Sequence, residues 1–171
     1  MSDELLKVEN LEVIYKTTQE TVQAVNKISF TLNKGETLGL VGETGAGKTT
    51  TALAIMQLLP KTGKILSGSM TFDERNLLEL SDEEMRLQIR GERIAMIFQD
   101  PMTALNPVMT VGEQIAEAVR YHSENIKEDE IQKRVDEVLE MVGIQASRKY
   151  EYPHQFSGGM KQRVVIAIAL S

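Results

Sequence analysis

The sequence contains no cysteine and no tryptophan, and its aromatic residues are limited to four tyrosines and four phenylalanines. Without cysteine, the chain forms no disulfide bond, no zinc–thiolate site and no thiol nucleophile. Long apolar runs are also missing. The longest, residues 164–170, is far shorter than the ~20 residues of a membrane-spanning helix. The acidic N-terminus lacks the features of a signal peptide, so we expect any membrane role to come through a partner.

Basic residues are fewer than acidic residues in this sequence. The net charge is −6 with a pI near 5.1, which argues against nucleic acid as the main partner. Of the 171 residues, 42% are hydrophobic and 26% charged, as in ordinary globular proteins. This length predicts one domain, or a core with a small subdomain.

The most specific motif is a glycine-rich loop at residues 42–49, which reads G-x-x-x-x-G-K-[ST]. The apolar run 36–41 before it predicts a strand, and residues 49–59 predict a helix that Pro60 ends. Such a loop turns successive N–H groups toward one polyphosphate at a helix N-terminus. We expect Lys48 to reach the β- and γ-phosphates and the Thr49 hydroxyl to ligate Mg²⁺. The predicted nucleotide-binding residues of this loop and helix start are Gly42, Glu43, Thr44, Gly45, Ala46, Gly47, Lys48, Thr49 and Thr50.

The flanking segments alternate between apolar and polar residues. Residues 5–15 and 22–32 predict an antiparallel pair of strands. Tyr15 ends the first of them, and taken alone a strand tyrosine indicates half-buried packing rather than a ligand site. Residues 61–67 are expected to form a loop and 68–72 a short strand. Ser81 and Glu84 form a capping box that predicts a helix start, not a metal site.

Residues 93–99 form a nearly continuous apolar run, which predicts a strand buried on both faces. Gln99 would then stand at the carboxyl end of a strand, where open α/β sheets place their ligands. On this pattern alone, a structural role for Gln99 remains the more common alternative.

The remaining sequence predicts helices. Thr110 and Glu113 form a second capping box, opening a helix that runs to about residue 121. A further helix is expected over residues 127–142, with Gly143 as its C-cap. Ser157 is a natural N-cap, and Gly158 and Gly159 expose the next amides, so this turn is a second potential anion site. His154, beside a proline, is more typical of a structural residue than of a catalytic one.

Taken together, these motifs resemble the nucleotide-binding subunit of an ABC transporter over essentially all 171 residues. Two segments are most similar to the oligopeptide, dipeptide and nickel importer branch: M-I-F-Q-D-P-M-T-A-L-N-P at residues 96–107 and Y-P-H-Q-F-S-G-G-M at residues 152–160. The resemblance implies that Tyr15 stacks on adenine and that Gln99 contacts Mg²⁺ and the attacking water. It also implies that Ser157, Gly158 and Gly159 contact ATP bound to an opposite subunit. Lys48 and Gln99 are the predicted catalytic residues, and Thr49 and Gln99 the predicted metal contacts.

The resemblance also implies the fold, an α/β P-loop NTPase domain of the ABC type. It would comprise an N-terminal antiparallel β-subdomain with the P-loop core over residues 1–99 and a helical subdomain with the signature motif over residues 100–171. The family pattern continues with a Walker B aspartate, a catalytic glutamate and a switch histidine, whereas 12 residues follow Gly159 here. We therefore expect an incomplete core sheet, a chain that is part of a longer subunit, and weak hydrolysis by this part alone.

The predicted function is that of an ATP-binding subunit of an ABC importer for di- or oligopeptides, with ATP and Mg²⁺ as cofactors. Expected partners are membrane-spanning permease subunits, a second ATP-binding subunit and, indirectly, a substrate-binding protein, at the cytoplasmic face of the membrane. Two alternatives remain: a nucleotide-binding or dimerisation module without turnover, and a soluble ABC-type ATPase unconnected with transport.

Overall fold

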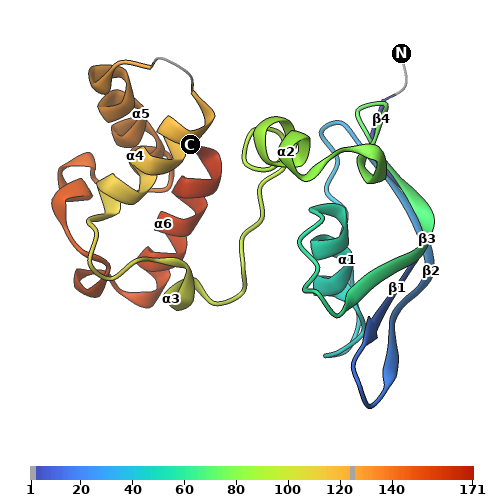
Figure 1. Cartoon of the computed structure of the whole chain (residues 1–171). Coiled ribbons are helices and arrows are strands. Elements are labelled where there is room, and N and C mark those ends of the chain that lie inside the picture. Colours follow the sequence, from blue (N-terminus) through green and yellow to red (C-terminus); the bar gives the residue numbers. More distant parts are fainter. Residues whose placement is uncertain (1–2, 124–125) are drawn as a thin grey trace. The chain divides into compact units, whose positions relative to one another are not determined.

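The computed structural model describes residues 3–123 and 126–171. The chain forms two compact units, Met1–Gln88 and Ile89–Ser171. The first contains a sheet and one longer helix, and the second is helical (Figure 1). The subdomain division at residues 99 and 100 stays a prediction.

An antiparallel sheet dominates the first unit. Its strands are β1 (Glu4–Lys16), β2 (Thr21–Asn33), β3 (Gly63–Phe72) and β4 (Arg75–Asn76), in the order β2-β1-β3-β4. The predicted pairing of the first two strands is confirmed. The prediction of a loop at residues 61–67 was wrong from Gly63 onward. There the hydrogen bonds between β3 and β1 continue, so these residues belong to the strand.

The apolar side chains of the sheet that face helix α1 (Lys48–Ile55) form the core of this unit, and α1 lies against β1 and β2 (Figure 1). Leu11, Val13 and Met70 are fully buried, as is Ala54 on the helix. Burying these groups on one face of each element is the main source of stability for such a two-layer arrangement. The sheet and α1 therefore fix the phosphate loop, which immediately precedes the helix.

Two expectations around the loop were wrong. Residues 36–41 are not a strand, and Leu38, Leu40 and Val41 are exposed. A strand is held by hydrogen bonds to a neighbour, and no strand among the described residues pairs with this segment. Helix α1 ends at Ile55, earlier than residue 59, because the chain turns at Gln57 with φ 50°.

The first unit ends in short helical turns. A 3₁₀ turn, η1 (Leu77–Glu79), buries Leu77, and α2 (Asp82–Glu84) continues into a π-helical turn over Met85–Ile89, whose last residue belongs to the second unit. The capping box predicted for α2 is confirmed. The Glu84 amide donates to Ser81 Oγ at 3.2 Å, and the Ser81 amide donates to Glu84 Oε2 at 2.8 Å.

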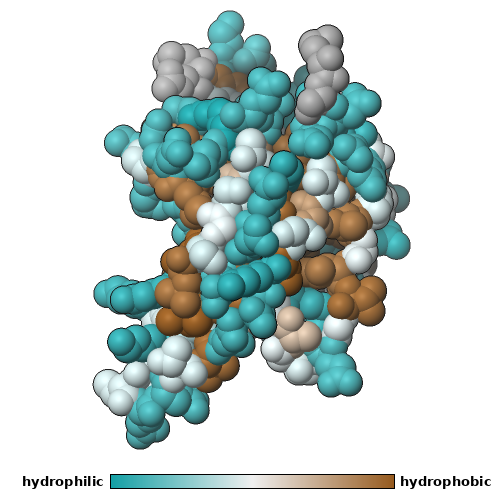
Figure 2. All heavy atoms as spheres, turned by 90° about the vertical axis from the view of Figure 1, so that its right-hand side faces the viewer, coloured by the Kyte–Doolittle hydropathy of each residue, from teal (hydrophilic) through white to brown (hydrophobic). Residues whose placement is uncertain are grey.

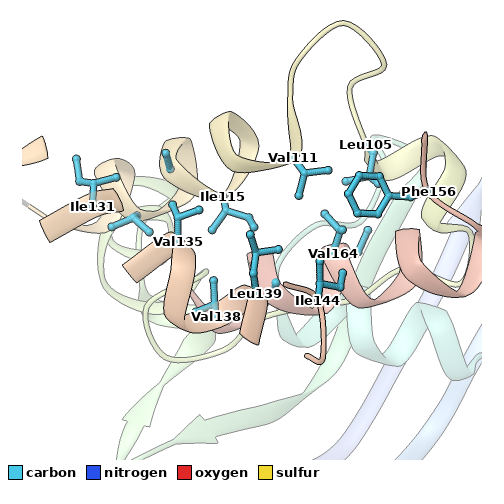
Figure 3. Close-up of a cluster of buried hydrophobic side chains, with 14 residues drawn as sticks. Leu105, Val111, Ile115, Ile131, Val135, Val138, Leu139, Ile144, Phe156 and Val164 are labelled. Carbon is cyan, nitrogen blue, oxygen red and sulfur yellow. The ribbon is translucent and has the colours of Figure 1, made fainter. Parts of the chain in front are cut away.

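The second unit packs helices α4 (Val111–His122), α5 (Glu128–Met141) and α6 (Gly158–Leu170) around one apolar cluster (Figure 3). Its short elements are α3 (Pro101–Ala104) and the 3₁₀ turns η3 (Ala146–Tyr150) and η4 (Pro153–Gln155). The helix predicted at residues 127–142 is present as α5, and its apolar stripe of Ile131, Val135, Val138 and Leu139 lies in this core. Ile115 and Val164 meet the stripe from the neighbouring helices. The capping box of Thr110 and Glu113 is also present.

Helix α5 ends as its sequence predicts. Gly143 has φ 72°, and its amide donates to Glu140 O at 2.9 Å, while the Ile144 amide donates to Leu139 O at 2.9 Å. This pair of bonds is the Schellman arrangement, which satisfies the last carbonyls of the helix. Ile144 and Leu139 are both buried in the cluster, so the cap also directs the chain back into the core.

The strand expected at residues 93–99 was wrong. The only pairing described in this region is an isolated parallel bridge between Arg90 and Ile94. Ile97 and Phe98 are 45% and 50% exposed, whereas a strand buried on both faces would cover them. No described strand runs beside this segment, so its apolar residues have no ladder to join.

The face turned toward the viewer in Figure 2 is largely hydrophilic, with several apolar patches. Within the described ranges, no helix combines the length and the hydropathy that a membrane span requires.

Candidate phosphate-binding site

The loop at residues 42–49 is built by two glycines in the left-handed region. Gly45 has φ 85° and Gly47 φ 83°, a conformation that costs other residues energy. Gly47 is also the N-cap of α1. A Cβ at this position would stand 2.2 Å from the carbonyl oxygen of Ala24 on β2, so the loop is pressed against the sheet there. The result is a tight turn that presents backbone amides at the positive end of a helix.

The Lys48 ammonium lies over this loop. Its Nζ donates to Gly42 O at 2.6 Å and to Glu43 O at 2.7 Å. An ammonium has three donor hydrogens, and two are used here. The third leaves one charge-assisted bond for an anion bound at the same loop.

Three consecutive threonines at the start of α1 have three different environments. The Thr51 hydroxyl is buried and donates to Gly47 O at 2.9 Å. Thr50 Oγ1 lies 3.2 Å from the Tyr15 hydroxyl. Thr49 is exposed, and its hydroxyl makes no hydrogen bond to the part of the chain that the structure describes. Thr49 is therefore the hydroxyl available to a metal ion or phosphate.

Tyr15 lies beside the loop helix rather than far from it. Its ring is half-buried, its hydroxyl bonds with Thr50, and a Cβ on Gly63 would approach Tyr15 Cε1 at 3.1 Å. The glycine thus leaves room for the ring at the edge of β3. The first unit brings Tyr15, Lys48, Thr49 and Thr50 together.

A cavity of about 440 Å³ adjoins the loop. Lys48 and Ala46 line it from the loop, and Gln23 and Val25 from β2. Tyr15 and Thr49 do not line it. The cavity therefore adjoins Lys48, whereas the Tyr15 hydroxyl and the Thr49 side chain lie outside its lining.

The remaining predicted site residues belong to the second unit. Ser157 caps α6 and accepts a hydrogen bond from the Met160 amide at 3.4 Å. Gly158 and Gly159 are exposed, and a Cβ at either position would meet nothing within 4 Å. Gln99 is exposed at a bend before α3.

Sequence reasoning missed Arg148, which precedes α6 and is paired with Glu151. The Arg148 guanidinium donates to Glu151 Oε2 at 2.6 Å, and this hydrogen bond holds the pKa of the Glu151 carboxyl below its ordinary value. The same contact raises the pKa of Arg148. The sequence offered only a weak signal, an Arg and a Glu three residues apart, which is also common on solvated surfaces.

Residues 25–171 match the ABC transporter family. The chain is 51% identical over 171 residues to the dipeptide transport ATP-binding protein DppD of Bacillus subtilis, covering 98% of this chain and 50% of the relative. It is 48% identical to the oligopeptide transport ATP-binding protein OppD of Escherichia coli, covering 99% of this chain and 50% of the relative. The chain thus spans about half the length of the curated relatives it matches.

Solved structures with the same fold are ATP-binding cassettes. The dimeric post-hydrolysis state of the cassette MJ0796, bound to ADP and Pi, superposes with a TM-score of 0.80 at 28% identity, covering 97% of this chain and 69% of that one. CbiO1 of Clostridium perfringens, part of the transporter complex cbiONQ, gives 0.77 at 32%, covering 99% and 62%. The expected fold class, an ABC-type α/β domain with an antiparallel β-subdomain, helices and an incomplete core sheet, is confirmed. On the family match and these similarities, the chain belongs to the ABC transporter family.

Proposed function

We propose that this chain is the nucleotide-holding part of an ATP-binding subunit that powers uptake of dipeptides or oligopeptides through an ABC importer. The observation that carries the proposal is the loop of Gly45 and Gly47 with the Lys48 ammonium 2.6 Å and 2.7 Å from two loop carbonyls. The names of the dipeptide and oligopeptide transport relatives favour a peptide cargo.

The phosphate side of the nucleotide would be held by this loop. Its amides and the third hydrogen of Lys48 would bind the β- and γ-phosphates. Mg²⁺ prefers oxygen ligands and keeps waters and nucleotide phosphates among them, so a single protein hydroxyl suffices as a protein contact. Thr49 fits that part, because its hydroxyl is exposed while those of Thr50 and Thr51 are engaged.

The base would lie on the side of Tyr15. The half-buried ring is held beside the first turn of α1, where it offers an apolar face for adenine to stack on. Gln99 would contact Mg²⁺ and the attacking water, and Ser157, Gly158 and Gly159 the ATP of an opposite subunit. The dimeric cassette among the similar structures supports a pairing of two such chains.

ATP hydrolysis, pairing with a second ATP-binding subunit and binding to membrane-spanning permease subunits are proposed for the whole subunit. It would work at the cytoplasmic face of the membrane and receive peptide indirectly from a substrate-binding protein. Co-purification with a permease subunit would support transport. Stable isolation of the native subunit without one, together with full turnover, would favour the soluble ATPase instead.

The decisive test is nucleotide affinity of a Lys48→Ala variant, measured by calorimetry with ATP and Mg²⁺. Loss of a charge-assisted contact of ~1.5–3 kcal/mol predicts a dissociation constant about 10- to 100-fold higher. Lys133→Ala is the control, because Lys133 is a surface lysine of the second unit with 79% of its side chain exposed. Equal affinity of the Lys48 variant and the wild type would overturn the proposal.

A further inference from the structure

The Arg148 side chain in η3 contacts four residues, Glu151, Gln155, Phe156 and Met160. Its Nε donates to Glu151 Oε1 at 3.0 Å, and its Nη2 donates to Glu151 Oε2 at 2.6 Å. Both side chains are mostly covered, with 29% and 31% exposed. The bidentate geometry fixes the plane of the guanidinium, which a single-point ion pair would leave free to rotate.

The fixed guanidinium reaches both sides of the Ser157–Gly159 turn. Before the turn, Nη2 donates to Gln155 O at 3.4 Å, and the guanidinium carbon lies 4.5 Å from the centre of the Phe156 ring. After the turn, Nη1 lies 3.4 Å from Met160 Sδ. Phe156 is itself buried in the helical core, so the contacts tie the turn to the rigid part of its unit.

We propose that Arg148 is a positioning residue for Ser157, Gly158 and Gly159. This inference rests on the proposed function, in which that turn presents amides to a nucleotide held by an opposite subunit. Arg148 touches no ligand in this scheme. It acts by holding the residues on either side of the turn, because an anion site made of backbone amides works only when their directions are fixed within a fraction of an ångström.

The chemistry of the contacts explains why arginine is needed. A planar fork can bind a carboxylate with two hydrogens, donate to a carbonyl with another and stack on an aromatic ring at the same time. Lysine has a point charge on a flexible stem and cannot make this set together. Arg148→Lys should therefore behave like Arg148→Ala at the turn, although it keeps the charge.

The neighbouring ion pair supplies a matched control. Lys149 Nζ donates to Asp136 Oδ1 at 2.7 Å, with 12% of the lysine side chain exposed, and joins η3 to α5. No described contact of this pair involves residues 155–160. Asp136→Asn thus weakens the same unit without touching the turn.

The first experiment needs no nucleotide. Amide hydrogen exchange is measured at Met160 and Lys161, whose amides donate to Ser157 Oγ and Ser157 O. For Arg148→Ala and Arg148→Lys, we expect the exchange rates of these two amides to rise, relative to wild type, by a factor about ten times or more that of the α4 amides. The reason is that local opening of the turn becomes easier. In Asp136→Asn, the exchange rates of Met160 and Lys161 relative to those of the α4 amides should stay near the wild-type value. Equal exchange at Met160 and Lys161 in wild type and both Arg148 variants overturns the positioning role, even if nucleotide never binds.

The second experiment uses the native subunit with ATP and Mg²⁺. Arg148→Ala should lower ATP-dependent pairing and kcat by about 10- to 100-fold while the dissociation constant for nucleotide at the phosphate loop changes by less than about twofold. Asp136→Asn should change neither. Wild-type subunit that binds no nucleotide would refute the proposed function. Intact pairing and kcat in Arg148→Ala, or an equal loss in Asp136→Asn, would refute the positioning role.

Discussion

The Tyr15 hydroxyl and Thr50 Oγ1 lie 3.2 Å apart, a hydrogen bond that joins the end of β1 to the first turn of α1 across 35 residues of sequence. It is the direct contact between the aromatic ring and the helix that follows the phosphate loop. Sequence spacing alone gives no indication of it.

Removing that bond should weaken nucleotide binding without abolishing it. Thr50→Val deletes the hydroxyl at nearly constant shape, and the loss of ~0.5–1.5 kcal/mol predicts affinity for ATP about 2- to 10-fold lower. Tyr15→Phe should cause a similar loss while keeping the ring. In a double-mutant cycle measured by calorimetry, the two losses should not add. Fully additive losses would show that the two hydroxyls act independently.

Alanine substitutions at Gly45 and Gly47 should differ in their cost, because the first introduces backbone strain alone and the second introduces strain and a steric clash. Both have positive φ, but a Cβ at Gly47 meets Ala24 O at 2.2 Å, whereas a Cβ at Gly45 meets nothing within 4 Å. Gly45→Ala should cost only the left-handed penalty of ~1–2 kcal/mol in the free energy of unfolding. Gly47→Ala should cost clearly more and remove ATP binding. Denaturant unfolding and ATP titration of both variants test this, and equal destabilisation would contradict the described contact with β2.

The capping box of α4 should make the helical unit sensitive to acid. The Thr110 amide and hydroxyl donate to Glu113 Oε2 at 2.7 Å and 2.8 Å, which holds the pKa of the Glu113 carboxyl below its ordinary value of 4.5. A carboxyl with a lowered folded-state pKa adds stability above its unfolded pKa and loses it as pH falls through the folded value. The contribution is therefore present at pH 7 and disappears below pH 4.5.

Glu113→Gln tests this sign. The urea midpoint of the variant should be lower than wild type at pH 7, and the two should converge as the pH falls below 4.5. Glu117→Gln, an exposed glutamate on the same helix, should follow the wild-type curve. Parallel curves for wild type and Glu113→Gln would exclude a role for the box in acid stability.

The helical core should depend strongly on Leu139. This side chain is fully buried and contacts the chain where the Schellman cap returns it to the core. Leu139→Ala should lower the free energy of unfolding by ~2–5 kcal/mol, the range for a buried leucine. Met141→Ala, two residues away and 61% exposed, is the control and should change it by less than ~0.5 kcal/mol. Similar midpoints for the two variants in urea would argue against the described core.

Local chemistry was predictable where it is contained within a few residues. Both capping boxes, the end of α5 at Gly143 and the β1–β2 pair follow from short patterns and appear as expected. Residues 36–41 and 93–99 did not become strands, because apolar runs of this kind need a neighbouring strand for their hydrogen bonds. The pattern indicates that a strand could form there but cannot supply the partner.

The site was predictable only in part for a similar reason. The loop motif identified Lys48 and Thr49, whose positions relative to the glycines are fixed by a few bonds. The contact of Gly47 with Ala24 depends on the packing of a distant strand, and the reach of Arg148 to Gln155 and Met160 depends on how η3 turns against α6. Such contacts are properties of tertiary structure, which a single sequence does not encode in any short pattern.

The hydrogen bond between Tyr15 and Thr50 also gives the first unit a spectroscopic signal of its own. Tyr15 is the sole tyrosine in residues 1–88, and the chain has no tryptophan to dominate its emission. Ultraviolet absorption and fluorescence of a phenol respond to the hydrogen bond of its hydroxyl and to an aromatic ring stacked on its face. Tyr15 is therefore an intrinsic optical probe at the place where the base of a nucleotide would arrive. Its signal is the difference between wild type and Tyr15→Phe, because three further tyrosines lie in the second unit.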